Sequence, residues 1–258
     1  MLAADAFWLE PSSLRLVEYE LPAPTPVLRG LRIAVISDLH GGSPYIGKDK
    51  IDAIAAMTNA AHPDMVLMAG DYVSGVPHIW GGPHISIEVI AAHLKAMKAP
   101  LGVYAVLGNH DNWRNPHRVM VALRQNGIQV LDNQHLAVPT PHGALTIVGL
   151  GDQRSHADNV VRALAGIAPG TRALCFTHAP DLFAQLPPTC ALTVAGHTHG
   201  GQVVLPLVGR LVVPSRFGYD AGVFHRDGKT LFVSTGIGTT TMPVRFGVPP
   251  EISLLSLR

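Results

Sequence analysis

The sequence is poor in charged residues, in cysteine and in long apolar runs. Charged residues make up 14% of its 258 positions and the formal net charge is +1, so the chain has no overall attraction for nucleic acid. No apolar stretch reaches the length of a membrane span. Apolar residues make up 47% of the chain, which is enough to bury a sizeable core in one large domain or two small ones.

The chain contains two cysteines, Cys175 and Cys190, and two cysteines do not make a disulfide framework. Cys175 lies inside an apolar run, so we expect it to be a small core residue and not a reactive thiol.

The first ten residues are apolar, but they are too few to span a membrane, carry Asp5 and lack a basic region, so we expect no signal peptide. Three interpretations stay open: the stub of an anchor, a segment that packs on the body of the protein, or a segment that touches a membrane surface. We therefore expect a cytoplasmic or peripherally membrane-associated protein with no transmembrane segment.

Histidine, in contrast, is abundant, and five of the 14 histidines belong to one recurring pattern. Apolar runs at 31–36, 65–69, 103–107, 173–176 and 192–195 are each followed by Asp, Asn or His. Any one of these polar residues alone is most often a cap or turn residue. As a set they are expected at the carboxyl ends of buried strands, where α/β sheets place their chemistry. The residues in these positions are Asp38, His40, Asp71, Asn109, His110, His178, His197 and His199.

The N-terminal half alternates strands with helices, and the C-terminal half is mostly β. Apolar spacing predicts helices over 48–61, 85–97 and 116–125. Asp38 and Asp71 are about one βαβ unit apart, so both should emerge at the same sheet edge. Residues 72–85, rich in Gly, Pro and aromatics, form either a pocket wall or a mobile surface loop.

Beyond residue 127 we expect only one short helix, over 159–165, among many short strands. Strand-like runs occur at 128–131, 135–138, 144–149, 202–205, 211–213, 221–224, 231–233 and 252–257. We predict an α/β (α+β) fold in which two mixed sheets pack face to face with helices outside. Residues 1–28 would form an N-terminal extension and edge strand, and residues 29–258 the domain itself.

Oxygen and imidazole ligands without cysteine suit manganese, iron or zinc. Two divalent ions need roughly four protein ligands each, and one carboxylate can bridge ions about 3.5–4 Å apart. Such a pair generates hydroxide at neutral pH and aligns it with a phosphoryl group.

These blocks resemble, in order and spacing, those of the calcineurin-like metallophosphoesterase superfamily: Asp38-Leu39-His40, Gly70-Asp71, Gly108-Asn109-His110-Asp111, His178 and Gly196-His197-Thr198-His199. The resemblance implies a four-layer αββα sandwich. Segments of the tail, at 219–222, 233–238, 243–246 and 249–252, resemble a bacterial branch of membrane-associated phosphodiesterases and UDP-2,3-diacylglucosamine pyrophosphatases. Relatives in that branch often carry a transmembrane helix, which this chain does not show.

The resemblance also implies a role for each residue. Asp38, His40 and His199 would bind a first metal ion, and Asn109, His178 and His197 a second. Asp71 would bridge the two ions. His110 would face the phosphate and assist the leaving group, with Asp111 orienting its ring. We further expect Tyr72 and Arg245 to contact substrate.

Two classes of function follow: an enzyme, or a binding module on the same fold. The complete ligand set together with His110 favours the enzyme, acting on a phosphodiester or pyrophosphate bond. UDP-2,3-diacylglucosamine is the specific alternative, and the substrate would be a small molecule or lipid-linked. The apolar stretch 205–217 is either a buried hairpin, which we favour, or a basic-edged flap that receives an acyl chain or meets a lipid surface.

Overall fold

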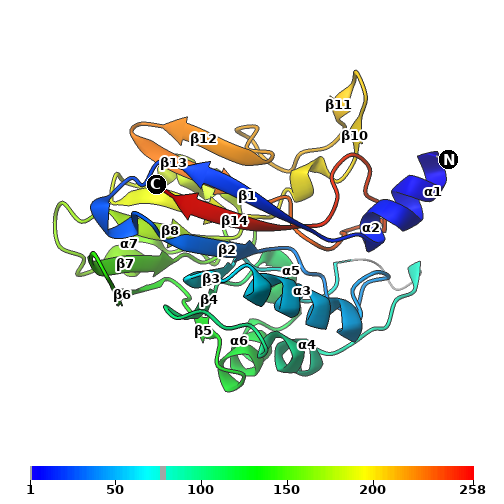
Figure 1. The fold of residues 1–258 in the computed structure, drawn as a ribbon, viewed down its shortest axis with the longest axis horizontal. Coiled ribbons are helices and arrows are strands. Elements are labelled where there is room, and N and C mark those ends of the chain that lie inside the picture. The colour runs from blue at the N-terminus through cyan, green and yellow to red at the C-terminus, as the bar shows by residue number, and fades with distance from the viewer. Residues whose placement is uncertain (1, 76–79) are drawn as a thin grey trace.

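The structure, a computed structural model, describes residues 2–75 and 80–258 and has two six-stranded sheets within those ranges (Figure 1). The first sheet has the order β1 (Arg15–Leu21), β14 (Glu251–Leu257), β2 (Arg32–Ile36), β3 (Met65–Met68), β4 (Val103–Ala105), β5 (Gln129–Val130). The second has the order β12 (Gly222–Arg226), β13 (Lys229–Val233), β9 (Cys190–Ala195), β8 (Ala173–Phe176), β7 (Gly143–Gly149), β6 (Gln134–Thr140). Parallel strands form the centre of each sheet, and antiparallel neighbours complete it. The prediction of two mixed sheets is confirmed.

Helices cover the outer faces of the two sheets. The first sheet is covered by α3 (Lys48–Ala60), α4 (Ile87–Leu94) and α6 (Pro116–Gln125), which match the three predicted helices with ends shifted by up to three residues. The second sheet is covered by α7 (Val160–Leu164) and the short helix η4 (Pro180–Gln185). Other short helices are α5 (Asn109–Arg114), η2 (Pro26–Leu28) and η5 (His199–Gly201). The result is the expected four-layer arrangement.

The apolar runs are continuous because the strands are buried on both faces. Side chains alternate across a strand, so Ile33 and Val35 of β2 enter the core between the sheets, whereas Ala34 and Ile36 pack under the helices. Since both faces are apolar, the polar residues of the central strands are concentrated where the strands end.

The N-terminal residues form a helical segment of three short turns, α1 (Leu2–Ala4), η1 (Asp5–Leu9) and α2 (Glu10–Ser12). This segment packs on the body, because Ala6 and Pro11 are buried. The Glu10 carboxylate accepts hydrogen bonds from the amides of Gly247 and Val248 at 2.8 and 2.5 Å. Among the described residues, no helix combines the length and apolar character needed to cross a bilayer. Strand β1 then pairs in parallel with β14 at the edge of the first sheet.

Cys175 is a buried core residue, as expected, but Cys175 and Cys190 also form a disulfide with their Cα atoms 5.4 Å apart, which the sequence reasoning did not predict. The two residues lie on adjacent parallel strands, β8 and β9, whose register shifts at Ala173 and Leu174. This separation lies within the range that a disulfide can bridge. The pairing depends on which strands become neighbours, and two cysteines in apolar runs do not reveal that.

The interpretation of residues 205–217 as a buried hairpin is wrong about burial. A small hairpin forms from β10 (Val204–Leu205) and β11 (Gly209–Arg210), and residues 211–213 lie outside any strand. Leu207 at its tip is fully exposed, and Val208, Leu211 and Val212 are also exposed. Figure 1 shows this hairpin projecting at the same end of the long axis as the N-terminal helical segment. We call residues 204–213 the flap.

Candidate dinuclear metal site

The predicted site residues converge where the carboxyl ends of the two sheets meet. Asp38 and His40 follow β2, Asp71 follows β3, and Asn109 and His110 follow β4. From the second sheet, His178 follows β8, and His197 and His199 follow β9. Their side chains form three groups in which the ligand atoms lie within 4.8 Å of one another: Asp38, His40 and His199; Asp71, His178 and His197; and His40, Asp71 and His110.

A left-handed backbone conformation orients five of these side chains towards the site. Asp38, His40, Asp71, His197 and His199 have φ values of 53°, 48°, 58°, 72° and 52°. A residue with a Cβ pays roughly 1–2 kcal/mol for this conformation, although Asp, Asn and His tolerate it best. Hydrogen bonds between neighbouring strand ends hold the turns, as from the Asp38 amide to the Gly70 carbonyl at 3.0 Å and from the His40 amide to the Asp71 carbonyl at 2.9 Å. Strain of this kind collects at functional sites.

The first cluster consists of Asp38, His40 and His199, all of them buried. Nε2 of His40 lies 3.2 Å from Nε2 of His199, which in turn lies 3.5 Å from Oδ1 of Asp38. Two facing ring nitrogens can share at most one proton, so one hydrogen bond does not satisfy all three groups. A divalent ion fits this set of electron-pair donors.

The second cluster consists of Asn109, His178 and His197. Nε2 of His178 lies 3.1 Å from Oδ1 of Asn109 and 3.1 Å from Nδ1 of His197. Nδ1 of His178 lies 2.8 Å from the carbonyl oxygen of Ala69, which can only accept, so Nδ1 carries a proton and Nε2 is the ring nitrogen that faces the cluster.

Asp71 lies between the clusters. Its Oδ2 atom is 3.3 Å from Nε2 of His178 and 3.7 Å from Nε2 of His40. Its Oδ1 atom accepts a hydrogen bond from the His110 amide at 2.9 Å, which fixes the carboxylate plane. One carboxylate oxygen is therefore within reach of both clusters.

The electrostatics favour cations. Burial lowers the pKa of His40 to about 4 and that of His197 to about 3, so both rings are neutral and able to bind a metal at pH 7. Burial raises the pKa of Asp38 to about 6. Burial alone would also raise the pKa of Asp71, but His178 and His40 outweigh it and lower that pKa below its ordinary value. The pKa of His178 is raised because Asp71 and Asp38 outweigh burial. Positive charge is thus favoured beside Asp71, whereas burial keeps His40 and His197 neutral.

The expected partnership of Asp111 with the His110 ring is not observed. The Asp111 carboxylate is fully buried, and it accepts four hydrogen bonds from main-chain amides. Their donors are Asp71 at 2.8 Å, Gly108 at 2.9 Å, Tyr72 at 3.0 Å and Val73 at 3.2 Å. Asp111 therefore braces the turn that carries Asp71, because it occupies the first turn of α5 and faces that turn.

The His110 ring instead lies beside the pocket opening. Its Nε2 atom is 3.4 Å from Oγ1 of Thr240, and its ring meets those of His40 and Trp113 edge to face at 5.0 and 5.2 Å. A Cβ on Gly75 would come within 2.8 Å of the His110 Cε1 atom, so only a glycine at this position avoids a clash with the His110 ring. By this geometry His110 lies closer to the first cluster and Asp71 than to the second cluster.

Tyr72 and Arg245 do not reach the pocket, contrary to our expectation of substrate contact. The Tyr72 hydroxyl donates to the carbonyls of Met68 and Val106 under α4. The Arg245 guanidinium is fully buried among main-chain carbonyls. Both side chains are fully buried, and their hydrogen bonds go to the protein itself.

The sequence reasoning missed several residues that shape the pocket. Oγ of Ser37 donates to Oδ2 of Asp38 at 2.5 Å. A Cβ on Gly196 would lie 1.7 Å from Ser37 Oγ and 2.6 Å from Asp38 Oδ2, so this glycine permits the approach of β9 to β2. Ser37 directly precedes Asp38 and Gly196 directly precedes His197, so their position next to predicted site residues could have indicated that they belong to the site. Thr240 had none, because it comes from a loop 130 residues after His110.

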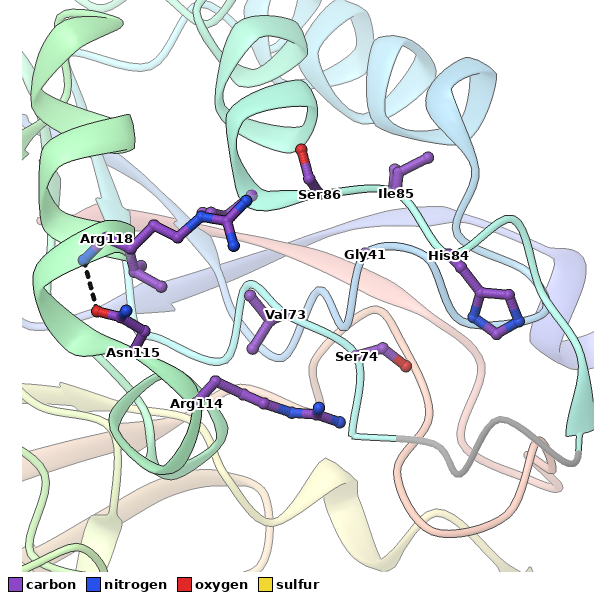
Figure 2. Close-up of a pocket in the computed structure, with 11 residues that line it drawn as sticks. Gly41, Val73, Ser74, His84, Ile85, Ser86, Arg114, Asn115 and Arg118 are labelled. Carbon is purple, nitrogen blue, oxygen red and sulfur yellow. Dashed lines mark hydrogen bonds between the residues drawn. The ribbon is translucent and has the colours of Figure 1, made fainter.

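Two cavities adjoin the site. An apolar cavity of about 380 Å³ is lined by His197 and His199 on one side and by Leu211, Val212 and Met242 on the other. A more polar cavity, also of about 380 Å³, lies beyond Val73 (Figure 2).

The polar cavity contains two arginines. Figure 2 shows Arg114 extending past Val73 towards Ser74, while the Asn115 side chain accepts from the Arg118 amide. The Arg118 guanidinium already pairs with Glu88 at 2.6 and 2.9 Å, so its charge is compensated.

Part of the 72–85 loop, through Val73, Ser74 and His84, does form a pocket wall, whereas residues 76–79 lie outside the described part of the chain.

Curated relatives match nearly the whole chain. A metallophosphoesterase of Aquifex aeolicus (strain VF5) is 27% identical over 97% of this chain and 94% of its own length. Phosphodiesterase YaeI of Escherichia coli (strain K12) is 26% identical over 97% and 90%. A transmembrane protein with metallophosphoesterase domain of Danio rerio is 28% identical over 95% of this chain and 57% of its own length.

Among solved structures, NAD nucleotidase (NadN) of Haemophilus influenzae matches with a TM-score of 0.51 and 16% identity, over 81% of this chain and 45% of that chain, which shows the fold alone. The family model described as calcineurin-like phosphoesterase matches residues 31–201, the span that contains every residue of both clusters. With a family match over most of its length, the chain belongs to the calcineurin-like phosphoesterase family and is a hydrolase that acts on phosphoester bonds.

Proposed function

We propose that the protein hydrolyses a phosphodiester or pyrophosphate bond with two divalent metal ions, manganese, iron or zinc. Asp38, His40 and His199 would bind the first ion. Asn109, His178 and His197 would bind the second, and Asp71 would bridge the pair. The observation that carries this proposal is the position of Asp71, whose Oδ2 atom lies 3.3 and 3.7 Å from ring nitrogens of the two clusters.

When bound, two divalent ions lower the pKa of water and neutralise charge on a phosphoryl group. The residues of the chain do the rest. Neutral His40 and His197 direct lone pairs into the pocket, and buried walls exclude bulk water, which strengthens every charge interaction inside.

We assign His110 to the leaving-group side. Its ring is half-buried and belongs to neither the first nor the second cluster, and its Nε2 atom lies 3.4 Å from Thr240 Oγ1. The amide of His110 is held by Asp71, so its ring is positioned relative to the reacting phosphate. From there it would donate a proton to the leaving oxygen or stabilise charge on the phosphoryl group.

A lipid-linked substrate is the finer candidate, with UDP-2,3-diacylglucosamine as one example. The apolar cavity supports this, since it begins at His197 and His199 and continues under the flap. The exposed apolar side chains of the flap and of Phe7, Trp8 and Leu9 support a peripheral membrane contact at the same end of the molecule. The edge of the flap is less basic than expected, because Arg210 pairs with Asp220 at 3.1 Å.

The test is a panel of substrates run with each metal in turn. It compares bis(4-nitrophenyl) phosphate, 4-nitrophenyl phosphate, a nucleoside diphosphate sugar and its diacylated form. We expect metal-dependent turnover of the diester and pyrophosphate compounds above that of the monoester. Preference for the diacylated compound over its deacylated counterpart would support the lipid-linked substrate. Binding of two ions without turnover of any compound would instead favour the binding module.

A further inference from the structure

Arg245 carries a fully buried positive charge without a carboxylate hydrogen-bonded to it. Its Nε and Nη2 atoms donate to the Gly238 carbonyl at 2.9 and 2.7 Å. Nη2 also donates to the Thr235 carbonyl at 3.0 Å, and Nη1 donates to the Val248 carbonyl at 2.9 Å. A buried guanidinium is retained only where its rigid fork of donors is satisfied, and here that fork joins two separate loops.

The same guanidinium lies against His199 of the first cluster and is linked to Asp38 through Gly238. Nη2 lies 3.3 Å from Nδ1 of His199, on the ring edge opposite to the one that faces the cluster. Gly238, whose carbonyl accepts two of the hydrogen bonds of Arg245, donates its own amide to the Asp38 carbonyl at 2.6 Å. A Cβ on the nearby Gly236 would lie 2.7 Å from the Asp38 Cβ, so this loop is pressed against the ligand.

The second cluster has a different support. His178 is oriented by the Ala69 carbonyl, and Asn109 begins helix α5. No contact between Arg245 and either of these residues is present among the described residues. A defect at Arg245 should therefore reach one cluster and spare the other.

The N-terminal helical segment fixes the main chain that carries Arg245. The Arg245 amide donates to the Ala6 carbonyl at 3.0 Å. Glu10 accepts hydrogen bonds from the amides of Gly247 and Val248, on the same short stretch. The Tyr45 hydroxyl joins the Phe7 carbonyl to the Pro243 carbonyl.

We propose that Arg245 is a positioning residue for the first metal ion, and that the N-terminal helical segment braces it through Glu10. The guanidinium holds the loop at Gly238, which in turn holds the main chain of Asp38, and it packs beside the outer edge of the His199 ring. This inference rests on the proposed assignment of Asp38, His40 and His199 to one ion. It adds a dependence of that ion on residues 5–10 and 243–248, which contribute none of its ligands.

The test is a titration of the metal-free protein with Mn²⁺, followed by calorimetry and electron paramagnetic resonance. Two bound Mn²⁺ ions that share Asp71 give a spin-coupled signal, whereas a single ion gives an uncoupled six-line signal. In Arg245→Lys the charge stays but one ammonium cannot reach all three carbonyls. We expect 10–100-fold weaker binding of one ion, the size of effect usual for residues that orient ligands, with the other unchanged. The coupled signal should be lost and should return at higher Mn²⁺ concentration.

Glu10→Gln provides a second variant that avoids a buried substitution, since it removes the charge that pairs with two amides but leaves Arg245 in place. We expect a smaller weakening of the same ion. Leu145→Ala, in the core between the sheets, is the control for lost stability and should leave both affinities unchanged. Equal weakening of both ions in Arg245→Lys, or no change in either in Arg245→Lys and Glu10→Gln, overturns the inference. If Arg245→Lys does not fold, the Glu10→Gln result decides. If the unaltered protein binds fewer than two ions, the proposed function itself fails.

Discussion

Asn109, His178 and His197 follow the ends of β4, β8 and β9, whereas Asp38 and His199 also lie against loops from the last 25 residues of the chain. The second cluster is supported mainly by the strands that carry it, as by the Ala69 carbonyl after β3. The first cluster depends on Arg245 and on the 235–238 loop, which are remote in sequence. The family blocks thus contain the residues of both clusters, but the support of the first cluster comes from the tail.

The two clusters are supported differently because of the order of strands in the first sheet. Strand β14 inserts between β1 and β2, so the residues just before it pass beside the turn that carries Asp38. Within that segment, residues 236–238 brace Asp38, and Thr240 lies against the His110 ring at the start of α5. The comparison can be tested by removing the shared ligand, then His110, then both ions together, and lastly the surfaces that lie outside the site.

The largest effect is expected from the residue that joins the two clusters. Asp71→Ala should lose both ions and turnover by on the order of 10⁴-fold or more, as for other central residues of an active site. Asn109→Ala is the matched variant, and it should mainly weaken the second ion. Elemental analysis of both purified proteins measures this directly. Near-full metal content in Asp71→Ala would contradict the bridging role.

His110→Ala should retain both ions and the fold but lose on the order of 10²–10⁴-fold in turnover, the range expected for general acid catalysis. The loss should be largest for esters with poor leaving groups, since an activated aryl leaving group hardly needs a proton. The measurement is kcat over a series of esters with graded leaving-group pKa. An equal loss across the series would make His110 an electrostatic stabiliser.

Metal content should be measured on the same His110→Ala protein, because the ring lies near His40 and Asp71. A fall in metal content parallel to the fall in activity would show that His110 is a ligand and not the acid. Trp113→Leu serves as a control, since it removes the aromatic neighbour of His110 and leaves the ring nitrogen in place.

Removal of both ions should lower stability without unfolding the protein. At free metal 100-fold above the dissociation constant, each ion adds about 2.7 kcal/mol to the free energy of unfolding. For a chain of this size the two together correspond to a fall in Tm of about 10–20 °C after chelation. Scanning calorimetry with and without a chelator measures the shift, and re-addition of Mn²⁺ is the control. An unchanged Tm would mean that the clusters bind no ion in the folded protein.

The sequence predicted the strands and the polar residues that gather at their ends because both depend on short-range signals. An apolar run followed by Asp or His, as in β2 and Asp38, is visible within ten residues. Pairings between distant segments left no such signal. Examples are the Cys175–Cys190 disulfide, the role of Asp111 in bracing Asp71, and the burial of Arg245. The exposed flap was misjudged because an apolar stretch looks the same whether it packs inside or faces outward.

The smallest effect is expected at the surface near the flap. Trp8, 72% exposed on the N-terminal helical segment, and Leu207 at the tip of the flap both lie at one end of the molecule. If this end meets a lipid surface, burial of each side chain adds up to roughly 1.5–3 kcal/mol, so each substitution should weaken binding by about tenfold or more. We therefore expect Leu207→Ser and Trp8→Ser to reduce flotation with vesicles of anionic and zwitterionic lipid, and the double variant to reduce it further.

Val161→Ser is the matched control, because Val161 is 84% exposed on α7 at the opposite end. Turnover of a water-soluble diester should be unchanged in all of them, since neither Trp8 nor Leu207 touches the metal clusters. Equal flotation of the Val161 variant and the double variant, or no flotation of the unaltered protein at low salt, would remove the membrane contact and leave the apolar cavity as a feature of the substrate site alone.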